Sequence, residues 1–185
     1  MTPSPLNSSQ DVVSLLKQQH QQIKSLFAAT LQASGEEREK NFFELRRLLA
    51  VHETAEEQVV HPKAKDEVPG GESIVDARLA EEQEAKEALA ELEDLDVDSP
   101  EFTSKLSALQ SDVIEHAEHE EHEEFDKLDE VLDAEQLRKL AKVVASVEKM
   151  APTRPHPNVR GRAANLIGGP FAAMMDRARD AMSAP

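Results

Sequence analysis

The chain has 185 residues, with 37 acidic and 21 basic side chains, so its net charge is −16. It contains no Cys, Trp or Tyr, which excludes a disulfide scaffold, a thiolate metal site, an iron–sulfur cluster and a phenolate ligand. Phosphate backbones and anionic lipid heads repel so acidic a protein, and no apolar run approaches the roughly 20 residues of a membrane span. We therefore expect a cytoplasmic protein that binds neither nucleic acid nor membrane.

The charge is distributed unevenly along the chain. Residues 151–185 hold five Arg and two Asp and are rich in Pro and Gly, so the acidity belongs to the rest of the chain. We expect a helical bundle over residues 1–132 and a fifth helix over 133–150 packed on it. Residues 151–185 are expected to form a Pro/Gly/Arg-containing connector and a short amphipathic C-terminal helix. A protein partner, where one exists, is expected at this basic segment.

Apolar residues at helical spacing predict four long helices joined by short loops. Ser99-Pro100-Glu101 combines a cap, a first-turn proline and a first-turn acid, which is typical of a helix start. The expected fold class is all-α, an antiparallel up-down four-helix bundle with additional C-terminal helices. The expected helices cover about residues 9–33, 36–61 with an end at Pro62, 72–95, from 99 onward, and a fifth from Asp133.

Ionisable side chains interrupt three of the apolar stripes. The first stripe contains His20, the second contains His52-x-x-x-Glu56 and the fourth contains His116-x-x-x-Glu120. A spacing of four places His and Glu on one helix face, one turn apart, where both reach a common point. His20 lies 15 residues before the turn at residue 35 and His52 lies 17 after it, a mismatch of about 3 Å along the bundle axis. We expect these five residues to meet inside the bundle.

Burying several carboxylates requires a compensating charge. An unpaired buried carboxylate is costly, whereas imidazole and carboxylate donors together suit a pair of iron or manganese ions. At the matching height of the third helix the chain has Gln83, a weak ligand. The centre could therefore be asymmetric, recruit Glu87 one turn further on, or keep an open coordination position. A metal-free core of paired His and Glu residues is the alternative.

Two further histidines lie near the predicted ligands. His119 is one turn from His116 and is a candidate for an extra ligand or for a residue that supports the ligands. His61 follows the second His-x-x-x-Glu segment, and we expect it to line a pocket or to support a ligand rather than to bind metal itself.

The pattern of His20, His52-x-x-x-Glu56 and His116-x-x-x-Glu120 on four helices resembles the hemerythrin-like, or HHE cation-binding, family over about residues 10–130. The resemblance implies two non-haem iron ions with oxo and carboxylate bridges, favoured over manganese or a mixed-metal pair, with both Glu side chains bridging. The family expects His where this chain has Gln83, which argues against reversible oxygen carriage. Ferritin-like di-iron bundles use Glu-x-x-His, and no Glu precedes any of the seven histidines by three residues.

The resemblance also carries an expected function. It implies a di-iron protein that binds or reacts with dioxygen, peroxide or nitric oxide in stress protection or sensing. Catalase-like, peroxidase-like and nitric-oxide-reactive chemistry all stay open, and no catalytic residue is assigned. The alternative is a non-enzymatic module for iron binding, buffering or signalling.

Overall fold

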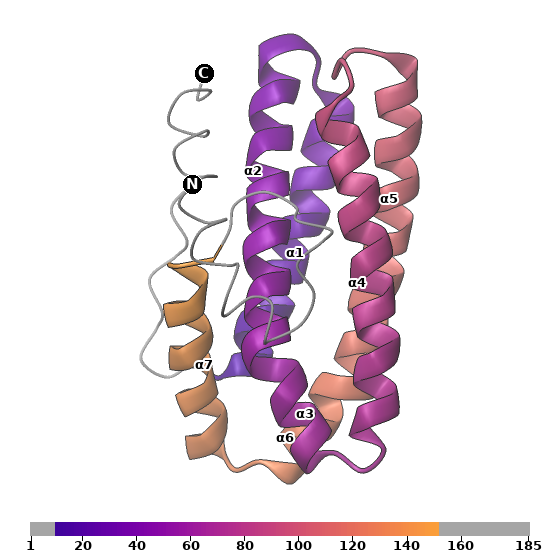
Figure 1. The fold of residues 1–185 in the computed structure, drawn as a ribbon. Coiled ribbons are helices and arrows are strands. Elements are labelled where there is room, and N and C mark those ends of the chain that lie inside the picture. The colour runs from indigo at the N-terminus through magenta and orange to yellow at the C-terminus, as the bar shows by residue number, and fades with distance from the viewer. Residues whose placement is uncertain (1–9, 152–185) are drawn as a thin grey trace.

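Residues 10–151 are described by the computed structural model, and they form an antiparallel four-helix bundle (Figure 1). This part of the chain contains no strand, and none of its helices is long and apolar enough to cross a membrane. The all-α prediction is therefore confirmed. The predicted C-terminal connector and helix lie outside the described residues. The bundle consists of α1 (Val12–Gln32), α2 (Gly35–Ala55), α4 (Gly71–Glu93) and α5 (Pro100–His119).

The second long helix does not end at Pro62, so that prediction was wrong. The chain passes from α2 through a π-helical segment, η1 (Glu56–Val60), into α3 (His61–Glu67). In η1 the backbone N–H of His61 donates to the carbonyl of Glu56, five residues back. Pro62 then occupies the first turn of α3, where its missing N–H and fixed φ are tolerated.

The fourth long helix has the same construction. It passes from α5 through a second π-helical segment, η2 (Glu120–Phe125), into α6 (Asp126–Val131). Each π segment begins at the Glu of a His-x-x-x-Glu motif. Such wide turns inside α-helices occur frequently at functional sites, and here they mark both halves of the predicted centre.

A glycine pair makes the sharp turn from α3 into α4. Gly70 has a φ of 76°, in the left-handed region where a side chain is strained. Gly71 packs so closely on the carbonyl of Ala64 that a Cβ atom would clash with it. The two glycines therefore allow α4 to fold back along α3.

The fifth helix, α7 (Ala134–Glu148), packs against α1 and α2 (Figure 1). Its start is fixed by a capping box, in which the Asp133 carboxylate accepts from the N–H of Gln136 and the Gln136 side chain accepts from the N–H of Asp133. The helix buries Leu137, Ala141 and Val144 against the bundle. The prediction of a fifth helix starting after Asp133 is confirmed.

The apolar core is divided into two clusters along the bundle. One cluster contains Leu16 of α1 and Phe125 of η2, and the other contains Phe27 of α1 and Phe102 of α5. On α1, His20 lies between Leu16 and Phe27 in the sequence, and the other long helices also carry their polar residues between the two clusters. The polar residues therefore form a layer with apolar packing on both sides.

We expect Phe102→Ala to lower the free energy of unfolding by about 3–5 kcal/mol, because it leaves a cavity in a closed core. Phe102 is fully buried and meets the ring of Phe42 edge to face, with the ring centroids 5.0 Å apart. Urea unfolding followed by circular dichroism measures the loss. Phe43→Ala is the matched control, since Phe43 is only partly buried; equal losses in the two variants would contradict the described core.

Candidate metal centre

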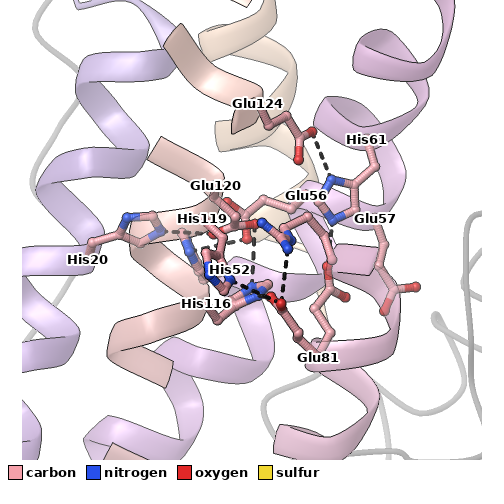
Figure 2. Close-up of polar contacts among 12 residues, drawn as sticks. His20, His52, Glu56, Glu57, His61, Glu81, His116, His119, Glu120 and Glu124 are labelled. Atoms are coloured by element: carbon pink, nitrogen blue, oxygen red, sulfur yellow. Dashed lines mark hydrogen bonds and ion pairs between the residues drawn. The ribbon is translucent and has the colours of Figure 1, made fainter. Parts of the chain in front are cut away.

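Four predicted ligands come together in the polar layer. His20, His52, Glu56 and Glu120 each offer a ligand atom, and these atoms all lie within 4.8 Å of one another. The four side chains are at most 2% exposed, and the contacts are close, with His52 Nε2 lying 3.1 Å from Glu56 Oε2. Figure 2 shows the rings of His20 and His52 directed toward the carboxylates. The sequence spacing therefore identified residues that the fold does bring together.

Glu120 connects this first group to His116. Its Oε2 atom lies 3.2 Å from Nε2 of His20, and its Oε1 atom lies 3.4 Å from Nε2 of His116. The two oxygens of one buried carboxylate thus face imidazoles from different helices. Glu120 could therefore offer one oxygen beside His20 and the other beside His116.

His116 belongs to a second group with two acids that the sequence reasoning missed. Glu53, Glu82 and His116 are all buried and also offer ligand atoms within 4.8 Å of one another. On α4 it is therefore Glu82 that joins the cluster. The amide nitrogen of its neighbour Gln83 donates to Glu87, which is exposed. Glu82 lies one residue before the predicted position, and a search for acids flanking Gln83 would have found it. The Oε1 atom of Gln83 is buried as well.

His61 lies at a third group, with Glu82 and Glu120. Its Nε2 atom is 2.5 Å from Glu82 Oε1, and its Nδ1 atom is 2.9 Å from Glu124 Oε1. Glu124 is fully buried. Burial lowers the pKa of His61, but the Glu124 and Glu82 carboxylates outweigh burial and raise that pKa well above its usual range.

The remaining predicted histidine lies outside all three groups. His119 is partly exposed, and its Nδ1 contacts Glu81 at 3.0 Å. Glu81 also accepts from His116, so His119 neighbours the centre through a shared carboxylate.

Each predicted histidine ligand is oriented by a second polar group on its Nδ1 atom. Glu121, Gln19 and Glu81 contact Nδ1 of His20, His52 and His116 respectively, each at 2.8 Å. An Nδ1–H donated in this way leaves Nε2 available and fixes the ring plane, as is usual for metal-bound histidines.

The fifth helix contributes to this arrangement. The Nε2 amide of Gln19 donates to Glu148 of α7 at 2.6 Å. Because the amide nitrogen is held by Glu148, the carbonyl oxygen of Gln19 is turned toward His52. Packing of α7 on the bundle therefore fixes the orientation of one ligand.

Burial and mutual charge strongly shift the pKa values of the cluster. Burial and the proximity of His20 lower the pKa of His52 to about 3, while burial and Glu82 raise the pKa of Glu53 to about 8. Burial and Glu120 raise the pKa of Glu56 well above its usual range. Burial lowers the pKa of His116, but Glu120 and Glu81 outweigh it and raise that pKa to about 10.

The donors of this cluster fit metal ions. Among the described residues, both carboxylate oxygens of Glu56 and of Glu120 are buried without a hydrogen-bond partner, as is Nε2 of His20. Such groups are costly in a protein interior. When ionised, Glu53, Glu56, Glu82 and Glu120 carry four negative charges, which two divalent cations would balance. Mixed imidazole and carboxylate donors suit iron or manganese.

Metal sites in helical bundles are built from side chains on facing helices. The buried layer of convergent His and Glu side chains therefore places this chain among metal-binding helical bundles. The sequence profile of the hemerythrin HHE cation binding domain matches residues 11–128, which is most of the chain. The chain therefore belongs to the hemerythrin HHE cation-binding domain family. The family binds cations, and the residues above are those that could hold them.

A solved structure has the same fold. It is the crystal structure of a hemerythrin HHE cation binding domain-containing protein from Mycobacterium kansasii, with a TM-score of 0.67 and 22% sequence identity. The match covers 76% of this chain and 86% of that one. No curated protein matches the chain significantly.

We expect Glu82→Gln to weaken metal binding, because it replaces an ionised buried donor with a neutral amide. The loss should exceed the 10–100-fold that is typical of residues supporting a ligand. Cobalt(II) titration followed by visible absorption measures it. Glu87→Gln is the control, since Glu87 lies five residues further along α4 and is exposed; the assignment of Glu82 to the cluster is incorrect if the control loses metal while Glu82→Gln does not.

Metal affinity should rise with pH between 6 and 8. The raised pKa values of Glu53, about 8, and His116, about 10, mean that both groups hold protons at neutral pH before metal binds. Metal must displace these protons, so affinity should increase about tenfold per pH unit for each proton released. Calorimetry in buffers of different ionisation enthalpy measures the protons. A pH-independent affinity would contradict the protonation states described here.

Proposed function

We propose that this protein holds a non-haem di-iron centre that binds or reacts with dioxygen, peroxide or nitric oxide in a stress-protective or sensing role. The observation that carries the proposal is Glu120, whose two oxygens face different imidazoles, one that of His20 and the other that of His116. Two groups of donors joined by one carboxylate support two neighbouring ions rather than one. Iron bound there would supply redox chemistry toward a small ligand.

A small cavity beside the cluster supports a small ligand. Its volume is about 10 Å³, room for about one water-sized molecule. Imidazoles, apolar side chains and the ionisable Lys24 and Glu53 line the cavity, and its size favours a very small ligand over a larger substrate. The lining includes His20, His52 and His116 together with Ile23, Val113 and Ala117.

The protein side chains around the cavity have separable tasks. The Nδ1 contacts of Glu121, Gln19 and Glu81 hold the three imidazoles in place. Ile23, Val113 and Ala117 are buried and supply the apolar part of the cavity wall, which strengthens the electrostatic interactions of the buried donors beside them. The residues around the cavity therefore favour a small ligand.

The proposal is tested by loading the purified protein with iron(II) without oxygen and then adding dioxygen, peroxide or nitric oxide. About two iron ions per chain and a change of the visible spectrum with at least one of the three ligands are expected. Sustained oxygen evolution from peroxide would identify an enzyme, and one stoichiometric change would identify a binding protein. Iron uptake with no response to any ligand would favour the iron-buffering alternative and contradict the proposal.

We expect Ala117→Leu to slow the ligand-induced spectral change by about tenfold or more while leaving the iron content unchanged. Ala117 is buried at the cavity wall, and a leucine there fills the space that the ligand needs. Stopped-flow absorption measures the rate. Ala108→Leu, on the exposed face of the same helix, is the control and should react like the unmodified protein.

A further inference from the structure

His61 has the same construction as the three predicted histidine ligands. In each ring, Nδ1 contacts an oxygen at 2.8–2.9 Å, and for His61 that oxygen belongs to Glu124. In each ring, Nε2 points to a carboxylate of the cluster, and for His61 that carboxylate is Glu82. Figure 2 shows His61 between Glu124 and the cluster. Like His20 and His52, His61 is 2% exposed.

The π segment η1 brings His61 to the cluster. In a regular α-helix a residue five positions after Glu56 is rotated by about 140° from it and faces away. Through η1 the N–H of His61 bonds to the carbonyl of Glu56, so the five residues close a single wide turn. His61 therefore returns to the helix face that carries Glu56.

A comparison of the two halves of the bundle shows that α4 has no imidazole where α1 has one, and that His61 lies beside that position. His20 and Glu82 occupy equivalent places, since each directly follows the residue, Gln19 or Glu81, that holds a ligand histidine. His61 and Phe125 are likewise equivalent, because each comes five residues after the Glu of its motif.

In one half, His20 stacks on Phe125 with the ring centroids 5.7 Å apart; in the other, Glu82 contacts His61. In the first pair the imidazole is on α1 and its partner ring ends η2. In the second pair the imidazole follows η1 and its partner on α4 is a carboxylate. A carboxylate stands on α4 where α1 has an imidazole, and an imidazole stands where the other half has a phenyl ring.

We propose that His61 is a direct metal ligand, binding through Nε2 beside Glu82 and Glu120 and supplying the imidazole that α4 lacks. This inference rests on the proposed dinuclear centre. Ligand atoms of the three residues lie within 4.8 Å of one another. Glu120 adds a buried carboxylate whose oxygens have no hydrogen-bond partner among the described residues. Glu82 then lies beside two imidazoles, those of His61 and His116.

The test is proton NMR of the full chain loaded with cobalt(II), in which the Nδ1–H of each bound imidazole gives a strongly shifted exchangeable signal. We expect one such signal from each of His20, His52, His61 and His116, because all their Nδ1 atoms are held by buried or partly buried contacts. His61→Gln should remove one signal. It should also lower the affinity for one of the two cobalt ions by more than about 100-fold, which is more than the loss of a residue that merely supports a ligand would cause.

His119→Gln is the matched control, because the Nδ1 of His119 also contacts a carboxylate although its ring lies outside the three groups. This variant should keep every signal and both ions. His61→Phe, which copies the Phe125 side of the bundle, provides a second variant should His61→Gln fail to fold. Signals from His20, His52 and His116 alone, with full cobalt content in the His61 variants, would overturn the ligand role of His61 and leave the dinuclear centre standing. A chain that takes up no metal would overturn both proposals.

Discussion

The structure depends on the cost of burying carboxylates in the middle of a helical bundle. Glu56, Glu82, Glu120 and Glu124 are all fully buried, and an uncompensated charge at such a depth destabilises a fold severely. Apolar clusters above and below the acids hold the helices in register. The bundle therefore maintains a polar layer that an apolar core would not need, and cations are the partners that its oxygen and nitrogen donors fit.

The hydrogen bonds that orient these donors extend from the centre toward the protein surface. The imidazoles are held by Gln19, Glu81, Glu121 and Glu124, and two of these four, Glu81 and Glu121, are partly exposed carboxylates. One link reaches the fifth helix, since Glu148 of α7 fixes the amide of Gln19. The additional helix is thus connected to the centre through two hydrogen bonds, and the centre belongs to the whole five-helix body rather than to four helices alone.

The two halves of the bundle are similar in backbone and different in chemistry. Both carry a His-x-x-x-Glu motif followed by a π segment. The first half places an imidazole on α1, and the second places a carboxylate on α4 with Lys86 between Glu82 and Glu57. This asymmetry distinguishes the centre from one built of two equal sites.

The sequence by itself determined the helical bundle, the fifth helix and the positions of His20, His52, Glu56, His116 and Glu120, because the apolar period and the spacing of four are local properties. Tertiary structure decided the contribution of α4 and the place of His61. The choice between Glu82 and Gln83 depends on a rotation of about 100° per residue, which the packing of α4 fixes and composition does not. The position of His61 depends on a π turn where Pro62 predicted a helix end, because a wide turn is held by surrounding contacts and leaves no period in the sequence.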